Sequence, residues 1–263
     1  MNYQKIQFEV REHIGILRLH DPTKLNALTP LMVDEINHVL DQSLNGIRAL
    51  IVTGTGRAFC SGAALDGGMG IPDPDFSKRD IGLVLEERIN PMMSRLRVLS
   101  IPWISVVRGA AAGAGASLGL AGDMVIASES AYFLQAFARI GLVPDAGSTH
   151  LLVRTIGRAR AMELMMLADR LPAAKALEWG LINRVVPDAA LDDEAFALAS
   201  ALAKGPTIAL SLIRKAVWTA VDTDWNTTLQ TERELQTTAG RTHDYDEGVA
   251  AFNAKRAAQF TGT

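Results

Sequence analysis

The chain is organised around residues 101–128, which read IPWISVVRGAAAGAGASLGLAGDMVIAS. An apolar, β-rich run at 101–107 leads into a segment of almost only Gly, Ala and Ser at 109–122, and a second apolar run follows at 124–127. This order predicts two strands flanking a helix of small residues. Such small side chains let a ligand approach the backbone, and the first amides of a helix have no internal partner. The segment therefore predicts an oxyanion-binding site.

One acidic residue, Asp145, lies in the largely apolar stretch FLQAFARIGLVPDAGST at 133–149. Its immediate sequence, Pro-Asp-Ala-Gly, is also ordinary turn chemistry, so a turn role stays open. A second small-residue segment at 59–65 could offer another backbone amide to the same oxygen. Two amides and one carboxylate are the minimal set for enolate chemistry, and apolar surroundings would raise the pKa of the carboxyl group towards a useful value.

Further towards the N-terminus, Thr29 and Pro30 predict the N-cap and first turn of a helix over 31–40. Short segments of strand character and one loop rich in Gly, Pro and Asp surround it. The expected elements are strands at 8–10, 14–19 and 49–53, a mobile loop at 67–80, and a helix at 81–99 that Pro91 kinks or breaks.

From residue 148 onward the pattern is helical almost without interruption. The expected helices are 158–168, 173–179, 191–204, 207–221, 224–239 and 244–258. Strands alternating with helices in the first part indicate an α/β fold. We therefore expect an α/β core at 1–187 that carries the site, and a helical C-terminal region at 188–263.

Composition excludes several classes of protein. The 263 residues are 48% hydrophobic and 21% charged, with a net charge of −3 and a pI near 6.0, which argues against nucleic acid as a partner. Cys60 is the only cysteine and the five histidines show no ligand spacing, so neither a disulfide nor a metal site is expected. The charged N-terminus lacks a secretory pattern and no uncharged run is long enough to span a bilayer, which predicts a cytoplasmic protein without membrane association.

Two short motifs compete for the small-residue segment. Gly115-Ala116-Ser117-Leu118-Gly119 matches the nucleophile elbow of hydrolases, but the downstream histidines, His150 and His243, are poorly placed for a triad. Gly113 also starts a G-x-G-x-x-x-G series, which is one residue too long for the dinucleotide-binding fingerprint. Close packing of the helix explains the same glycines without a nucleotide.

Several long motifs, in order, carry a resemblance to a known family. They are KLNAL at 24–28, GRAFCSGAAL at 56–65, residues 101–128, IGLVPDAGSTHLL at 140–152, ALEWGLINRVV at 176–186 and EGVAAFNAKRAAQF at 247–260. Along nearly its whole length the sequence resembles the crotonase, or enoyl-CoA hydratase/isomerase, superfamily. The C-terminal stretch AGRTHDYDEGVAAFNAKRAAQFTG at 239–262 and Asp145 resemble the ring-1,2-epoxyphenylacetyl-CoA isomerases of phenylacetate degradation most closely.

This resemblance implies a crotonase-like spiral of β-β-α turns, a C-terminal helical region that trimerises, and CoA thioester substrates. Coenzyme A is then part of the substrate, no separate cofactor is needed, and the expected assembly is a homotrimer or a dimer of trimers. The oxyanion hole would be formed by the backbone N–H groups of Ala63 and Ala114. The residues implied in CoA binding are Lys24, Asn26, Ala27, Leu28, Ala64, Leu65 and Asp66, with Phe252 and Lys255 from a neighbouring subunit.

Departures from the family pattern select the reaction. Hydratases of the family use two glutamates at the positions of Ser117 and Phe137, and neither of these residues can act as a general acid or base. With Asp145 as the only acid, the sequence predicts an acyl-CoA isomerase of fatty acid or phenylacetate catabolism. It would shift a double bond from Δ3 to Δ2, or convert a ring-1,2-epoxide to an oxepin, or both. A hydratase by kinship, an Asp-nucleophile dehalogenase or thioesterase, and an inactive acyl-CoA-binding protein remain alternatives.

Overall fold

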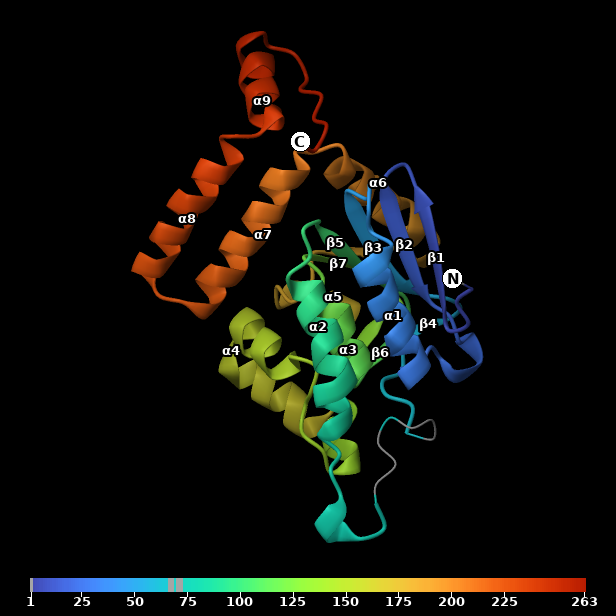
Figure 1. Ribbon diagram of the computed structural model, residues 1–263. Helices are drawn as coiled ribbons and strands as arrows, with labels where there is room; N and C mark the ends of the chain where they lie inside the picture. The colour runs from blue at the N-terminus through green and yellow to red at the C-terminus, as the bar shows by residue number, and fades with distance from the viewer. Residues whose placement is uncertain (1, 66–68, 70–72) are drawn as a thin grey trace.

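The computed structural model describes residues 2–65, 69 and 73–263, and its strands form two sheets (Figure 1). A six-stranded sheet has the order β1-β2-β3-β5-β7-β10 and is parallel except for the β1–β2 hairpin. A four-stranded sheet has the order β4-β6-β8-β9, in which only β8 and β9 are antiparallel.

The strands are short, and most consist of β-branched and other apolar residues. Those of the six-stranded sheet are β1 (Ile6–Arg11), β2 (Ile14–Leu19), β3 (Ala49–Gly54), β5 (Trp103–Val107), β7 (Met124–Ser128) and β10 (Arg184–Val186). Those of the four-stranded sheet are β4 (Ala58–Cys60), β6 (Ala110–Ala112), β8 (Tyr132–Leu134) and β9 (Arg170–Pro172).

Successive strands alternate between the two sheets. β3 is followed by β4, β5 by β6 and β7 by β8, and after each such pair the chain forms a helix, namely α2 (Asn90–Arg97), α3 (Ala114–Leu120) and α4 (Ser148–Leu167). Each turn of the chain thus adds one strand to each sheet and one helix. This is the spiral of β-β-α turns that the family resemblance implies, and the prediction of fold is confirmed.

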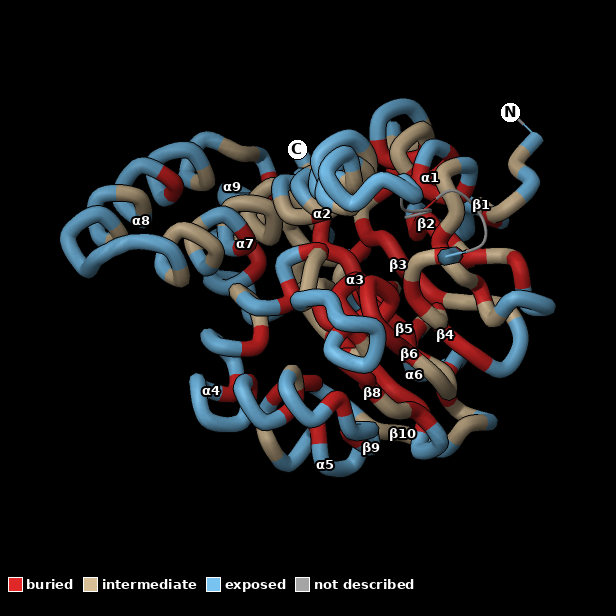
Figure 2. Tube along the Cα trace, turned by 90° about the horizontal axis from the view of Figure 1, so that it is seen from below, coloured by how far each residue is buried: buried red, intermediate tan, exposed pale blue. Residues whose placement is uncertain are grey.

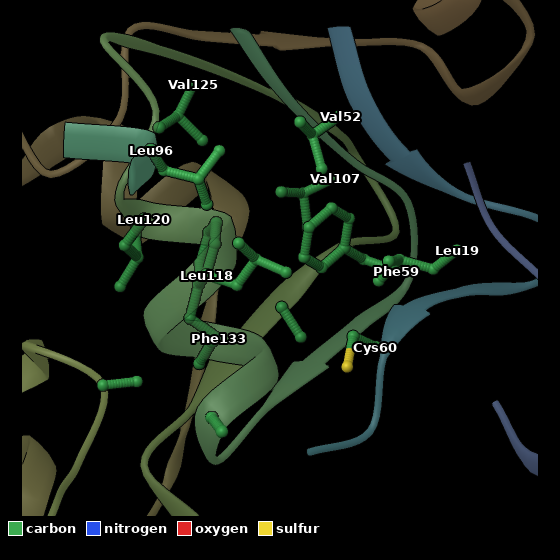
Figure 3. Close-up of a cluster of buried hydrophobic side chains, with 14 of the residues drawn as sticks. Leu19, Val52, Phe59, Cys60, Leu96, Val107, Leu118, Leu120, Val125 and Phe133 are labelled. Atoms are coloured by element: carbon green, nitrogen blue, oxygen red, sulfur yellow. The ribbon is translucent and has the colours of Figure 1, made fainter. Parts of the chain in front are cut away.

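The main core lies on the inner side of the six-stranded sheet, and α3 runs through it (Figure 2). Figure 3 shows how side chains from both sheets and from α3 meet there, among them Phe59, Leu118 and Phe133. The outer face of the same sheet is covered by α6 (Leu191–Ala203). Because both faces are covered, every residue of β5 is buried. The α6 helix belongs to the C-terminal region that was expected to begin at residue 188, and it packs on the sheet of the core. The domain boundary at 187 stays a prediction.

Helix starts follow the local signals closely. In α1 (Pro30–Gln42) the hydroxyl of Thr29 accepts from the Met32 amide at 3.2 Å, which confirms the predicted N-cap. The helix predicted over 81–99 contains a π-helical turn, Leu85–Ile89, which continues directly into α2, and Pro91 lies in the first turn of α2 rather than at a break. Part of the loop predicted at 67–80 lies outside the described residues.

The prediction that the chain is helical almost without interruption after residue 148 is wrong. β9 and β10 are three-residue strands in this region, and α5 (Ala173–Glu178) separates them. Strands this short contain too few residues to show an alternating pattern, whereas the partners that fix them, β8 and β7, are far away in the sequence. The small-residue segment also contains β6, which was not predicted.

Three C-terminal helices form an arm that projects from the body of the molecule (Figure 1). They are α7 (Thr207–Asp222), α8 (Trp225–Ala239) and α9 (His243–Asn253), the last of which ends earlier than the predicted 258. Among the described residues no single helix is long and apolar enough to cross a membrane. One pair of helices, 188–203 and 207–222, is long and apolar enough when taken together, but the two are bent by 104° and qualify by length and composition only.

Candidate active site

Two backbone segments lie side by side where neighbouring parallel strands end. β4 and β6 are paired, and the chain leaves them through Gly62 and Gly113. A Cβ atom on Gly62 would lie 2.9 Å from the Ala112 carbonyl oxygen, and 3.7 Å from Cα of Gly113. The absence of a side chain lets the segments touch. The next residues along each segment, Ala63 and Ala114, are consequently neighbours.

The amides of these two alanines are free of partners within the described part of the chain. Leu28 N donates to Gly62 O at 2.8 Å and Ala64 N donates to Leu28 O at 2.8 Å, so this ladder leaves out the N–H of Ala63. Ala114 is the first residue of α3, where an N–H group has no partner inside the helix. Two unpaired donors on adjacent segments are what a developing oxyanion requires.

One oxygen of the Asp145 side chain makes no hydrogen bond that would help to hold the fold together. Its Oδ1 is buried and has no hydrogen-bond partner among the described residues. The turn role left open by the sequence is filled by the backbone instead, because the N-cap of α4 is Gly147, without a side-chain cap bond. Burial raises the pKa of the Asp145 carboxyl group from 3.8 to about 6. A half-buried carboxylate with a free oxygen and a pKa near neutrality is a candidate proton shuttle.

The backbone after Asp145 holds it towards α3. Ala146 and Gly147 both have left-handed conformations, with φ of 53° and 81°, so the chain turns sharply before α4 begins. The hydroxyl of Ser117 in α3 donates to the carbonyl oxygen of Asp145 at 3.1 Å. Since Ser117 lies one helical turn after Gly113, this bond brings the carboxylate segment to the helix that carries the Ala114 amide.

Ser117 and Phe137 occupy the positions at which the resemblance places the hydratase glutamates. Ser117 is fully buried, and its hydroxyl also lies 3.4 Å from the carbonyl oxygen of Gly113. Phe137 is buried as well, and its Cζ lies 4.0 Å from the position of a Cβ on Gly113. Both residues therefore border the site, but neither supplies a titratable group.

The segment expected to bind CoA borders the same site. Leu28 forms a parallel bridge with Ala63, and Asn26 adopts a left-handed conformation with φ of 55°. The Asn26 side chain is fully buried and donates to the carbonyl oxygens of Thr55 and Ala58 at 2.9 and 2.8 Å. It therefore shapes the loop, and because the Asn26 N–H donates to the carbonyl oxygen of Asp21 at 2.9 Å, only its backbone carbonyl is left for a ligand.

The remaining residues of this group are less uniform in position. Ala27 is half-buried, Ala64 is buried, and Lys24 and Leu65 are exposed. Asp66 lies outside the described residues. Among the residues implied in CoA binding that the structure describes, those around Leu28 are held against the Ala63 segment by a parallel bridge.

Phe252 and Lys255 lie far from this site within one chain. Phe252 belongs to α9 and Lys255 follows it, at the end of the arm remote from β4 and β6 (Figure 1). Both side chains are exposed. Their predicted contact with CoA can be made only across a subunit interface, and it stays a prediction.

Sequence reasoning did not find a cavity beside Asp145. It has a volume of about 200 Å³, and Ala146 and Gly147 form part of its wall. Trp103, at the start of β5, and His150, in α4, also line it. A Trp within an apolar strand and a His within an apolar helix were visible in the sequence, but only the fold brings them together.

Cys60 is packed in the core beside the site. Cys60 is fully buried against Gly115, and burial raises the pKa of its thiol to about 12. Among the described residues no three His, Cys, Asp or Glu side chains are grouped so that they could hold a metal ion.

The chain is similar in sequence to known proteins over nearly its whole length. Residues 9–263 match the family described as Enoyl-CoA hydratase/isomerase. The chain is 45% identical over 255 residues to the 1,2-epoxyphenylacetyl-CoA isomerase of Escherichia coli strain K12, covering 96% of this chain and 97% of that protein. It is 39% identical over 262 residues, with 100% of both chains covered, to a Rhodobacter capsulatus protein named "Probable enoyl-CoA hydratase".

Solved structures show the same fold. The crystal structure of an enoyl-CoA hydratase from Bacillus anthracis superposes with a TM-score of 0.90 at 31% identity, over 99% of this chain and 100% of that one. Together with the match over residues 9–263, this shows that the chain belongs to the enoyl-CoA hydratase/isomerase family, also called the crotonase superfamily.

Proposed function

We propose that this protein is an acyl-CoA isomerase that works through a thioester enolate. The thioester oxygen accepts hydrogen bonds from the amides of Ala63 and Ala114, and the α- or γ-proton becomes acidic. Asp145 removes this proton and returns it at another carbon of the allylic system, which moves the double bond from Δ3 to Δ2. The composition of the substrate is unchanged, and no other reactant is needed.

Each part of this site supplies a definable share of catalysis. A backbone amide that meets the oxyanion in a site shielded from water is worth about 3 kcal/mol in the transition state. A positioned base contributes roughly 10²- to 10⁴-fold in rate. Ala63 and Ala114 serve the first purpose because their N–H groups are already free, so no existing hydrogen bond is broken when substrate binds.

The observation that carries the proposal is the half-buried carboxylate of Asp145, whose Oδ1 is buried and has no partner among the described residues. With a pKa of about 6 it is mostly ionised at pH 7.5, as a base must be, and it becomes a competent acid once it has accepted the substrate proton. A single group that both removes and returns one proton is sufficient for isomerisation.

Hydration is less well supported by this site. Addition of water across a double bond needs one group to activate the water and another to protonate the α-carbon. Ser117 and Phe137 stand where the family resemblance places these groups, and Phe137 has no polar atom in its side chain. A hydratase reading therefore rests on kinship alone, including the names of several relatives.

A second substrate for the same machinery is favoured by one relative. The protein of Escherichia coli that is 45% identical to this chain is named 1,2-epoxyphenylacetyl-CoA isomerase. Its name suggests that the present site also converts a ring-1,2-epoxide thioester to an oxepin. Both reactions need a polarised thioester and one proton carrier, so a single active site can accept them.

The test is the conversion of a 3-enoyl-CoA to its conjugated isomer, followed by the ultraviolet absorbance of the 2-enoyl thioester. Wild-type protein should produce the absorbance, and Asp145→Asn should lose about 10²-fold or more of the rate while it still binds acyl-CoA. Asp169→Asn, which changes an exposed carboxylate after α4, is the matched control and should keep full activity.

Two other results would redirect the assignment. A covalent acyl-enzyme on Asp145, trapped by rapid quenching and detected by mass spectrometry, would show that this residue is a nucleophile, as in a dehalogenase or thioesterase. Tight acyl-CoA binding without turnover of either the 3-enoyl or the ring-epoxide thioester would identify an inactive binding protein. Asp145→Asn with an unchanged kcat would remove the proton shuttle from the mechanism.

A further inference from the structure

The position of the Asp145 carboxylate depends on the backbone that carries it. Its Oδ1 has no hydrogen-bond partner among the described residues, so no such bond fixes this oxygen directly. The turn that follows is strained, because Ala146 has a φ of 53°, which a residue with a Cβ rarely adopts. A strained conformation of this kind persists only where the surrounding structure holds it. The contacts around the turn therefore decide where the carboxylate lies.

The backbone carbonyl group of Asp145 accepts two hydrogen bonds from two different helices. The hydroxyl of Ser117 in α3 donates to it at 3.1 Å, and the amide of Ser148, the first residue of α4, donates at 3.0 Å. The first bond runs directly to the helix that begins with the oxyanion amide. The second spans only the turn itself, so it fixes Asp145 only if Ser148 is held in turn.

Ser148 is held by a second buried polar side chain, that of Gln135. The Ser148 hydroxyl donates to Oε1 of Gln135 at 2.9 Å, and the two residues are 1% and 0% exposed. Gln135 directly follows β8, and the carbonyl oxygen of Leu134 at the end of that strand accepts from the amide of Gly113 at 2.8 Å. Gln135 therefore ties the start of α4 to the backbone segment that carries the oxyanion amide.

Together these contacts form a closed network that contains both the base and the residue before the oxyanion amide. Its members, in order, are Gly113, Leu134, Gln135, Ser148, Asp145 and Ser117, whose amide donates to the carbonyl oxygen of Gly113 at 3.2 Å. Because the network is closed, the backbone of Asp145 cannot move relative to Gly113 without straining or breaking at least one of these bonds.

The side-chain amide of Gln135 is present although half of it is unsatisfied. Its Nε2 is buried and has no hydrogen-bond partner among the described residues. A buried donor without a partner opposes folding, and an apolar side chain of similar length avoids this penalty. Packing alone therefore favours an apolar residue here, and what the amide supplies in its place is the bond to Ser148.

We propose that Gln135 and Ser148 are positioning residues for the Asp145 carboxylate. They keep it in reach of a substrate whose thioester oxygen lies at the oxyanion amides, and both act through Asp145 without contacting the substrate. This inference rests on the proposed function, in which one carboxylate removes a proton from C2 of a 3-enoyl-CoA and returns it at C4. Two carbons have to be reached in turn from one place, so little misplacement is tolerated.

Gln135→Met and Ser148→Ala each remove one end of the bond between them. In steady-state kinetics with a 3-enoyl-CoA, each should lower kcat about 10- to 100-fold and change KM less than about 3-fold, because the contacts with the thioester are unchanged. The double variant should lose no more than either single variant, since both act through one contact. Wild-type kcat in both single variants, or losses that add in the double variant, would overturn the proposal.

Ser128→Ala is the matched control for these variants. It also deletes a fully buried hydroxyl group, which lies 3.0 Å from the hydroxyl of Ser130, but it does so in β7 of the other sheet. It should keep the wild-type kcat. A loss in Ser128→Ala as large as that in Ser148→Ala would attribute both losses to general instability and would overturn the proposal.

Proton exchange in D2O separates misplacement of the base from a loss of folded protein. Return of a deuteron at C2 leaves labelled 3-enoyl-CoA, whereas return at C4 gives the 2-enoyl product. A loosely held carboxylate reaches one carbon more easily than two in turn, so the ratio of labelled substrate to product should rise at least about threefold in Gln135→Met and Ser148→Ala. Loss of folded protein lowers both rates equally, so a wild-type ratio in both variants would overturn the proposal.

Failure of the proposed function gives a different pattern in the same experiment. If wild-type protein labels 3-enoyl-CoA at C2 but forms no 2-enoyl product, double-bond isomerisation is excluded, and slower labelling in both variants leaves the positioning role standing. If wild type isomerises and both variants keep its kcat and its ratio, the isomerase stands and the positioning role is excluded. Neither label nor product with wild type would overturn both.

Discussion

The Asp145 carboxylate is kept where it costs the folded protein free energy. Its pKa rises from 3.8 to about 6 on burial, with no partner to offset the loss of water. The folded state therefore holds this proton more tightly than the unfolded chain. Stability contributed by the protonated group is present below pH 3.8 and is lost as the pH rises through about 6. A site that serves only folding would not retain such a group.

Replacement of this carboxyl group should accordingly stabilise the protein at alkaline pH. Asp145→Asn removes the charge, and the rise from 3.8 to about 6 corresponds to at most about 3 kcal/mol. We expect a gain of about 1–2 kcal/mol at pH 8 and almost none at pH 4, because the asparagine is itself a buried polar group. Urea unfolding at the two pH values measures it. An equal effect at both pH values would show that Asp145 is not desolvated.

The same ionisation sets the pH dependence of catalysis. A base must be unprotonated, so kcat/KM for a 3-enoyl-CoA should be constant above pH 7 and fall tenfold per pH unit well below about 6. The profile of the free enzyme gives this value directly from initial rates. A decline that begins only near pH 4 would contradict the raised pKa of Asp145.

Gly113 positions the Ala114 amide, and a side chain there would strain the backbone although it would meet only ordinary contacts. Its φ of 53° and ψ of −131° fall in a region that only glycine occupies readily. Gly113→Ala should move the start of α3 and lower kcat about 10²- to 10³-fold, the usual cost of one lost oxyanion donor. Gly46→Ala is the control, because Gly46 also has a positive φ of 76° but lies in open space. Similar losses in both variants would attribute the effect to general instability.

At the residue scale the sequence identifies the reacting groups better than their surroundings. Asp145 stands out because it is the one acid in an apolar stretch. Small residues pointed to two backbone segments, but only the family resemblance implied the amides of Ala63 and Ala114 within them. Trp103 and His150 could not be predicted, because nothing local distinguishes a core tryptophan from one that lines a cavity. Their common wall is created by β5, α4 and α7, which are far apart in the chain.

At the scale of elements, one buried ion pair joins the C-terminal arm to the core. Arg214 of α7 lies 2.5 Å from Oδ2 of Asp123, and its side chain also donates to the carbonyl oxygens of Leu96 and Leu99 in and after α2. The same Asp123 oxygen accepts from the Trp103 amide. Burial raises the pKa of Asp123 more than Arg214 lowers it, so the pair is strongly desolvated. This contact fixes α7 against the cavity wall.

Breaking this pair on one side should be costly. Arg214→Met leaves the Asp123 carboxylate buried without its cation, and we expect a loss of about 3–5 kcal/mol. The double variant Arg214→Met with Asp123→Asn should recover part of it, because no charge is then left alone. Arg18→Met, at an exposed pair 2.7 Å from Glu9, should cost less than about 1 kcal/mol. Urea unfolding of the wild type, the two single variants and the double variant measures these changes in the free energy of unfolding. Equal losses in Arg18→Met and Arg214→Met would contradict the argument.

Long elements could be predicted from the sequence, whereas very short strands could not. The helix after Thr29 could be predicted from its cap and its period. Pro91 signalled an irregular helix, but the structure has a π-helical turn at Leu85–Ile89, before the proline, and no break at Pro91 itself. The strands β6, β9 and β10 could not, because each has three residues and is defined by a partner strand elsewhere in the chain. Tertiary pairing outweighs local pattern at this length.

At the scale of the whole molecule, the arm of α7, α8 and α9 projects from the body (Figure 1) and is largely exposed or half-buried (Figure 2). Large exposed apolar residues occur in all three helices: Ile213, Val217, Trp225, Leu229, Tyr245, Val249 and Phe252. Patches of this kind usually mark an interface. The spiral could be assigned from the sequence only through family resemblance, and the expected trimer follows from the same resemblance, so it requires its own measurement.

The assembly prediction can be tested together with the predicted sharing of the active site. Light scattering should give about three times, or six times, the monomer mass of 28.3 kDa. Phe252→Glu, at a position 83% exposed in one chain, should weaken the assembly if α9 lies in the interface. A mass of 28.3 kDa for wild type would contradict the trimer.

Mixed assemblies then show whether Lys255 serves its own chain or a neighbour. Asp145→Asn alone should be inactive, and Lys255→Ala alone should bind CoA thioesters weakly, with a KM raised about 10-fold. After the two variants are unfolded together and reassembled, sites with an intact Asp145 lie on Lys255→Ala chains. If the lysine comes from the adjacent subunit, a fraction of these sites receives it from an Asp145→Asn chain and regains the wild-type KM. Activity that stays at the raised KM would place Lys255 in its own chain's site or outside it.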